Sequence, residues 1–173
     1  MTARIRSLAP LLAPGVTLVV AAVAHTLLTG RGALMAEHVH RLQIELFLDG
    51  EIRVHRWIPM IPGFHTAVAS LATLAGDRGL DTLRLVAAPL GLLAVAGAWL
   101  LARRVTPERT AERTLQILFL PPLFPLMFLL YTDALAIGLV LLSLHASLRG
   151  RPTAAGAAGA PPVLGRQRSG GWP

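Results

Sequence analysis

The stretch LPPLFPLMFLLYTD, residues 120–133, is an apolar run that three prolines interrupt and that ends on an aromatic ring, a hydroxyl and a carboxylate. An ionisable group beside a membrane-depth segment is costly, and it usually has a partner or a function. Prolines in such a segment free backbone carbonyls, which must then face protein or water instead of lipid. The stretch therefore predicts a polar site at a membrane surface, with Asp133 among its groups.

The composition of the 173-residue chain favours an integral membrane protein, because 54% of the residues are hydrophobic, only 14% are charged and the mean hydropathy is +0.60. The absence of cysteine excludes disulfides and thiolate metal sites. All 16 basic residues are arginines, and they lie between apolar runs, where membrane topology accounts for them. No basic stripe with interleaved aromatic residues is present, so nucleic-acid binding is not expected.

The apolar runs predict an all-helical, multi-pass fold with five membrane segments, near 8–28, 58–76, 85–102, 115–131 and 134–148. The first run is expected to be a retained anchor, because a signal peptide has a shorter apolar region of about 7–15 residues. Arg4 and Arg6 place the N-terminus in the cytoplasm, but the arginines of 103–113 favour the same side after three spans. The side of the membrane that faces Asp133 therefore stays open.

Residues 33–48 predict an amphipathic helix on the membrane surface, because apolar side chains recur there at helical spacing and charged side chains share another face. Trp57 follows at the depth expected for an interfacial aromatic residue. Residues 149–173 are rich in Ala, Gly and Pro, so a disordered or aberrant tail is expected there.

Four segments carry a family resemblance, and they occur in this order: MAEHVH at 35–40, Trp57 and Pro59 followed by Pro62-Gly63, LRLV at 83–86, and Pro122-Leu123 through Tyr131-Thr132-Asp133. Together they resemble the terminal α-1,2-glucosyltransferase family of the lipid-linked oligosaccharide pathway, which has a GT-C fold. The resemblance covers roughly residues 10–148. It implies an N-terminal GT-C module that moves glucose from a dolichyl-phosphate or polyprenyl-phosphate sugar to a lipid-linked glycan, with inversion and without a covalent enzyme intermediate.

The chain also departs from the family pattern. The family has an acidic pair where this chain has Ala36-Glu37, and Trp-Asp-Pro where it has Trp57-Ile58-Pro59. Family members are far longer and carry an Arg-Gln-Thr-Asn motif, whereas Arg166-Gln167 is followed here by other residues. Three alternatives are open: a GT-C glycosyltransferase or its N-terminal part, the same class of enzyme acting on a different cell-envelope glycan or lipid if the source is bacterial, and a truncated, inactive membrane protein or small membrane interaction protein. The tail is also open to interpretation as a frameshifted remnant of the Arg-Gln-Thr-Asn region.

An inverting sugar transfer requires a carboxylate that accepts the proton of the acceptor hydroxyl, and the candidates are Glu37 and Asp133. Other roles are open for both, because Glu37 can pair with Arg41 one helical turn away, and Asp133 can cap a helix that begins at Ala134. The departing phosphate requires dipolar or cationic groups. The predicted substrate-binding residues are His40, Arg41, Trp57 and Tyr131.

No metal site and no organic cofactor are expected, and a divalent-metal requirement stays open. His38 and His40 lie about 200° apart on a helix, so they do not converge on one ion. The expected partners are membrane lipid, the sugar donor and the glycan acceptor. The expected location is the plasma membrane for a bacterial source and the endoplasmic reticulum membrane for a eukaryotic one.

Overall fold

The computed structural model describes residues 2–34, 36–56, 58 and 63–165, with side chains described between 12 and 160. Within these ranges the fold is all-α, as predicted, and no strand is found. Met35, Trp57, Pro59 and Pro62, on which parts of the family resemblance depend, lie outside the described residues.

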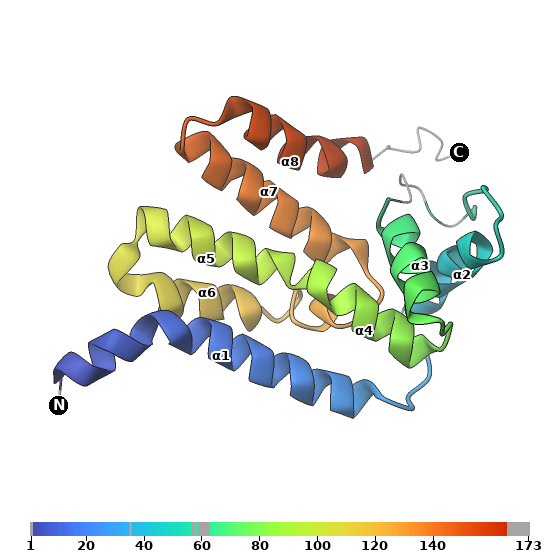
Figure 1. Ribbon diagram of the computed structural model, residues 1–173, viewed down its shortest axis with the longest axis horizontal. Coiled ribbons are helices and arrows are strands. Elements are labelled where there is room, and N and C mark those ends of the chain that lie inside the picture. Colours follow the sequence, from blue (N-terminus) through green and yellow to red (C-terminus); the bar gives the residue numbers. More distant parts are fainter. Residues whose placement is uncertain (1, 35, 57, 59–62, 166–173) are drawn as a thin grey trace.

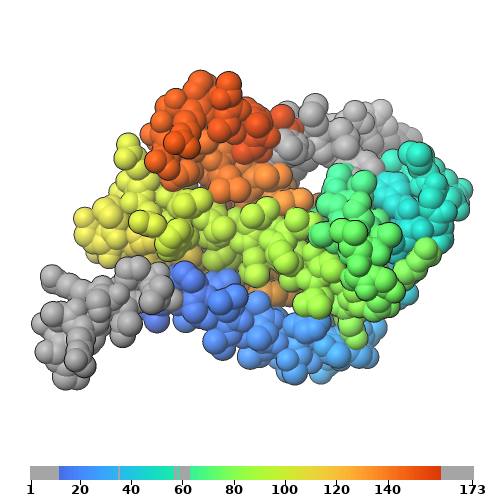
Figure 2. All heavy atoms as spheres, viewed as in Figure 1, coloured from blue at the N-terminus to red at the C-terminus, as the bar shows by residue number. Residues whose placement is uncertain are grey.

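Six helices run side by side and two stand at one end of them (Figure 1). The six are α1 (Thr2–Leu28), α4 (Leu80–Gly91), α5 (Leu93–Val105), α6 (Thr110–Leu118), α7 (Thr132–Leu148) and α8 (Pro152–Gly165). The two at the end are α2 (Glu37–Leu48) and α3 (Gly63–Ala75). In the space-filling view α1 lies along one edge of the molecule and α8 along the opposite edge (Figure 2).

Helices α4 and α5 follow one another directly and form the apolar segment Leu80–Val105, within which an 18-residue window has a mean hydropathy of 2.2. Of the residues that the structure describes, only this segment is long and apolar enough to cross a membrane, and three other apolar helices are shorter. Pro89 lies inside α4 and lacks the N–H that would bond to the carbonyl one turn earlier, and the two helices are separated by a single residue, Leu92.

Glycines bring α5 and α7 together. A Cβ atom on Gly138 of α7 would lie 2.6 Å from the backbone nitrogen of Ala94, and one on Gly97 of α5 would lie 2.8 Å from the Cβ of Leu141. Small residues of this kind let helix backbones approach closely, as they do in membrane bundles. The packing of α7 on α5 therefore depends on the absence of side chains at these two positions.

The apolar run expected to span the membrane at 115–131 is not one helix. Helix α6 ends at Leu118, and the chain then turns repeatedly, with a single 3-10 turn, η2 (Pro125–Met127), before α7. The prolines account for this difference, because each removes a backbone donor and clashes with the preceding helical turn. Most of the apolar side chains of this segment are buried in the core, among them Leu123, Met127 and Leu130. We call residues 119–131 the proline segment.

Residues 152–165, expected to belong to a disordered or aberrant tail, form α8 instead, which packs along α7. Alanine is the strongest helix former, and small residues permit close approach. The Ser143 hydroxyl of α7 donates a hydrogen bond to the carbonyl of Ala155 at 2.7 Å, and the Ala155 side chain is buried. The composition that suggested disorder thus supplies a helix-packing surface.

Candidate functional site

Glu37 and Arg84 form a buried ion pair between the first residue of α2 and the second turn of α4. Arg84 Nε lies 3.0 Å from Glu37 Oε1, and Arg84 Nη2 lies 2.7 Å from Glu37 Oε2. The side chain of Arg84 is 2% exposed, and that of Glu37 is 0% exposed. Such a two-point contact matches the planar guanidinium fork to the carboxylate. The ion pair fixes the start of α2 against α4.

The remaining donors of Arg84 hold the loop that joins α1 to α2. Arg84 Nη1 donates to the carbonyls of Leu28 and Arg31, both at 3.0 Å, and Nη2 donates to the carbonyl of Gly32 at 2.9 Å. A guanidinium has five N–H donors, and Arg84 uses all five in these bonds and the ion pair. Arg84 therefore has no donor left for a ligand.

The carboxylate oxygens of Glu37 are also engaged, because they accept hydrogen bonds from the backbone N–H groups of Leu34 at 3.0 Å and Leu130 at 3.1 Å as well as from Arg84. Burial raises the pKa of the Glu37 carboxyl, but the hydrogen bonds from Arg84, Leu34 and Leu130 outweigh burial and hold the pKa below its usual value. The role of Glu37 as a proton acceptor stays a prediction. These contacts favour a structural role, because an ionised, buried and fully bonded carboxylate is a poor base.

A second cluster lies one helical turn further along α2, and we call His40, His65 and Tyr131 the aromatic cluster. His40 Nδ1 lies 2.9 Å from His65 Nε2 of α3, and the two rings stack with centroids 5.2 Å apart. The ring of Tyr131 lies 5.1 Å from that of His40. The backbone N–H of Ala36 donates to the Tyr131 hydroxyl oxygen at 2.7 Å, which leaves the Tyr131 O–H as a donor.

Asp133 lies beside the aromatic cluster, in the first turn of α7, and its side chain is exposed. Burial lowers the pKa of the His40 imidazole, and the negative charge of Asp133 works against that shift, so the two groups lie within electrostatic reach. Helix α7 begins at Thr132 without a side-chain cap bond, so Asp133 is not the helix cap considered above. Its exposed carboxylate therefore lies within electrostatic reach of the aromatic cluster.

Of the two other predicted binding residues, Arg41 is not brought to this place. Arg41 pairs with Glu45 on α2, with Nε 2.7 Å from Oε1, and both side chains are more than a third exposed. The alternative pairing of Arg41 with Glu37 is therefore not formed, because Arg84 takes that place. Trp57 lies outside the described residues.

Two residues of the site, Arg84 and His65, were not predicted from the sequence. Arg84 lies within the LRLV segment at 83–86, where a buried charge in an apolar stretch was a usable signal. His65 follows Phe64 in a short apolar run and had no comparable signal in the sequence.

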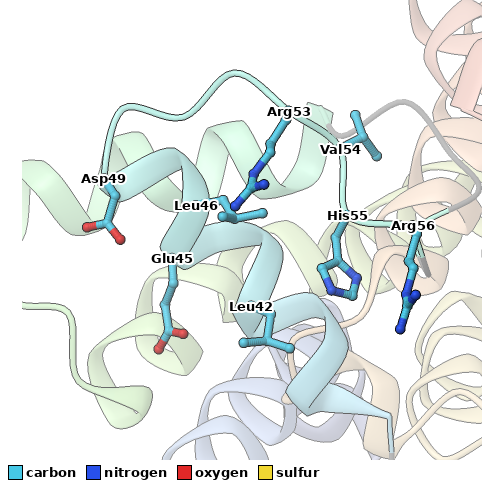
Figure 3. Close-up of a pocket in the computed structure, with 8 residues that line it drawn as sticks. All are labelled: Leu42, Glu45, Leu46, Asp49, Arg53, Val54, His55 and Arg56. Atoms are coloured by element: carbon cyan, nitrogen blue, oxygen red, sulfur yellow. The ribbon is translucent and has the colours of Figure 1, made fainter.

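Two hollows flank the site. One, of about 490 Å³, lies between α2 and the loop 51–56, where the buried Gln43 bonds to the backbone of Arg53 and His55. Its lining is Leu42, Glu45, Leu46, Asp49, Arg53, Val54, His55 and Arg56 (Figure 3). The other is an apolar groove of about 250 Å³ between α1 and α4, which Leu28, Leu85 and Phe128 line together with Arg84. Neither hollow shares a residue with the aromatic cluster.

Among the residues with a described placement, no group of three or more His, Asp or Glu side chains is arranged to hold a metal ion. Comparisons of the chain with protein families, with curated proteins and with solved structures find no match.

Proposed function

We propose that this chain is a multi-pass membrane glycosyltransferase, or part of one, which moves a hexose from a polyprenyl-phosphate or dolichyl-phosphate sugar to a lipid-linked glycan. The supporting observation is that three of the segments that resemble the glucosyltransferase family converge in space. Glu37 of 35–40 bonds to Arg84 of 83–86 and to the backbone of Leu130, across 47 and 93 residues of sequence. Such convergence is what a site assembled from those segments requires.

In this proposal Asp133 is the general base. The acceptor hydroxyl attacks the anomeric carbon, its proton passes to the Asp133 carboxylate, and the bond from the anomeric carbon to the phosphate oxygen breaks. The lipid phosphate leaves with the bonding electrons, and the anomeric centre inverts. Asp133 suits this role better than Glu37, because its carboxylate is exposed while that of Glu37 is buried and fully bonded.

The neutral donors of the aromatic cluster then face the substrates. The Tyr131 O–H and one N–H of His40 are available for oxygens of the sugar or phosphate. Glu37 and Arg84 organise this arrangement, since they tie the loop after α1, the start of α2 and the residue before Tyr131 together. The role of this pair is to position the other groups.

Besides the segment Leu80–Val105, the helices α1 and α7 have exposed apolar faces. These faces support a location in the membrane with several spans. Large apolar side chains between 38% and 69% exposed recur along α1 and α7: Leu12, Leu18, Val19, Val23 and Leu27, and Ile137, Val140, Leu144 and Leu148. Extended apolar surfaces of this kind suit lipid better than water. The apolar groove between α1 and α4 suits the hydrocarbon chain of a lipid substrate.

The test is sugar transfer by the full chain in lipid vesicles, with radiolabelled polyprenyl-phosphate glucose and a lipid-linked glycan. We expect Asp133→Asn to lower transfer by at least about 100-fold, the scale of a lost general base. Glu108→Gln is the matched control, because Glu108 is an exposed acid in the loop after α5. Equal transfer by Asp133→Asn and the wild type would remove Asp133 as the base.

One observation favours a second function, that of a catalytically inactive membrane protein. Ala36 occupies the position of the other member of the family's acidic pair, and it is exposed beside Tyr131. The site therefore lacks one carboxylate where the resemblance places it. Wild-type chain without transfer to any lipid-linked acceptor would support this second function.

A further inference from the structure

His65 carries a polar atom that nothing in the described part of the chain explains. Its side chain is 0% exposed, and its Nδ1 has no hydrogen-bond partner among the described residues. Its other nitrogen, Nε2, faces His40 Nδ1 at 2.9 Å. One ring nitrogen of this buried histidine contacts another histidine, and its second ring nitrogen is unpaired. This arrangement requires a physical explanation.

The short contact between the His40 and His65 rings limits where their protons can lie. Two neutral imidazoles joined by one N···N contact share a single proton, so one nitrogen donates and the other accepts. The His40 side chain is 8% exposed and the His65 side chain 0% exposed, and such burial favours the neutral form of both rings. Only two arrangements are then possible, and they differ in which ring donates.

The unpaired His65 Nδ1 distinguishes these arrangements. If His40 donated, His65 would carry its proton on Nδ1, as an N–H without an acceptor. Orphaned buried N–H groups are rarer in proteins than under-satisfied acceptors. The favoured arrangement puts the His65 proton on Nε2, where it is donated to His40 Nδ1. His40 must then carry its own proton on Nε2.

We propose that His65 is a positioning residue that holds His40 in the Nε2–H form, so that His40 donates a hydrogen bond to the phosphate of the lipid-linked sugar. The nature of that ligand rests on the proposed function, whereas the proton arrangement does not. Arg84 cannot serve the phosphate, because its five donors are all engaged. The phosphate is instead met by neutral donors, His40 Nε2–H and the Tyr131 O–H. The opposite arrangement would make His40 Nε2 an acceptor, which repels a phosphate oxygen.

The test is the tautomer of His40, observed by long-range ¹H–¹⁵N correlation spectra of the ¹⁵N-histidine-labelled full chain in detergent micelles. His40→Gln identifies the His40 signals among the six histidines. We expect a protonated Nε2 and an unprotonated Nδ1 at His40. In His65→Phe, which keeps a ring but has no nitrogen, we expect a mixture of both forms. In His65→Gln, whose amide nitrogen can replace Nε2 as a donor, the Nε2–H form should return.

Two results would overturn the proposal: a proton on His40 Nδ1 in the wild type, or an unchanged His40 spectrum in His65→Phe. The wild-type and His65→Gln spectra decide the question if His65→Phe does not fold. For an active chain, we expect His65→Phe to lower kcat/KM by about tenfold, the lower end for a lost partner that orients a histidine, and His65→Gln to restore most of it. Absence of sugar transfer with the expected tautomer would contradict the proposed function alone.

Discussion

The ion pair of Glu37 and Arg84 and the cluster around His40 and Asp133 lie side by side, yet their hydrogen-bonding capacities are used in opposite ways. Arg84 engages all of its donors, and Glu37 accepts four bonds in the protein interior. The Asp133 carboxylate is exposed, and the Tyr131 hydroxyl accepts a bond while its own proton stays available. The difference separates groups that hold the fold from groups that can react.

The same difference in bonding is why the proposed function assigns the role of base to Asp133 and not to Glu37. A carboxylate acts as a base only if one of its oxygens has a free lone pair that can accept the proton. At Glu37 the bonded neighbours occupy the lone pairs and keep the pKa low. The Asp133 carboxylate is exposed, so its oxygens are accessible to water.

The largest effect is expected from Arg84→Met, which removes the cation and leaves Glu37 buried without its partner. Breaking a buried pair on one side costs about 3–5 kcal/mol, because the remaining charge is uncompensated. We expect that loss in the free energy of unfolding, measured by denaturant titration in detergent. Arg78→Met is the control, because Arg78 pairs with Asp49 on the surface, with side chains 62% and 58% exposed. A loss below about 1 kcal/mol for Arg84→Met would contradict the buried pair.

A smaller loss is expected from Glu37→Gln, which keeps the size of the side chain but removes its charge. The amide still accepts bonds at one oxygen, while its NH₂ group meets the donors of Arg84. We expect about 2–3 kcal/mol of destabilisation, the range for a lost hydrogen bond to a charged group and its unpaired partner. The double variant with Arg84→Met should be more stable than the sum of the two single losses predicts. Additive losses would show that the two residues do not interact.

The all-α class and the presence of a helix near residues 33–48 were predictable, because both depend on local periodicity. The helix expected over 33–48 forms as α2, Glu37–Leu48. The proline segment was not predictable as a core element, because an apolar run has the same composition whether it faces lipid or protein. Its prolines already indicated that its backbone is irregular, and irregular backbone at membrane depth must be buried in protein.

The candidate site was predictable only in part. Glu37, His40, Tyr131 and Asp133 were selected from the sequence, and the structure brings them close together. The residues that pair with Glu37 and His40 could not be identified from the sequence. Arg84 lies 47 residues from Glu37, and His65 lies 25 residues from His40. Local spacing pointed to Arg41 instead, which pairs with Glu45.

Acid should begin to weaken the two regions at different pH values, near 6.5 for the histidines of the aromatic cluster and near 4.5 for Glu37. The His40 pKa is below its usual 6.5, so the unfolded chain binds more protons than the folded one as the pH falls below 6.5, and stability declines. The Glu37 pKa is below its usual 4.5, so the stability from its ionised form is present above pH 4.5 and is lost as the pH falls through the folded-state pKa. We expect His40→Gln to make the first decline shallower and to leave the second unchanged. If the stability of the wild type and of His40→Gln declined equally below pH 6.5, the His40 ring would be exposed to solvent.

The smallest effect on stability is expected from Asp133→Asn, although its effect on transfer is expected to be large. Asp133 is exposed and forms no cap, so its loss removes only a favourable charge from the first turn of α7. We expect a change of about 0.5 kcal/mol or less in the free energy of unfolding, measured under the conditions used for Arg84→Met. A loss comparable to that of Glu37→Gln would show that Asp133 is as engaged as Glu37. The distinction between a saturated pair and an open cluster would then be wrong, because both acids would be holding the fold.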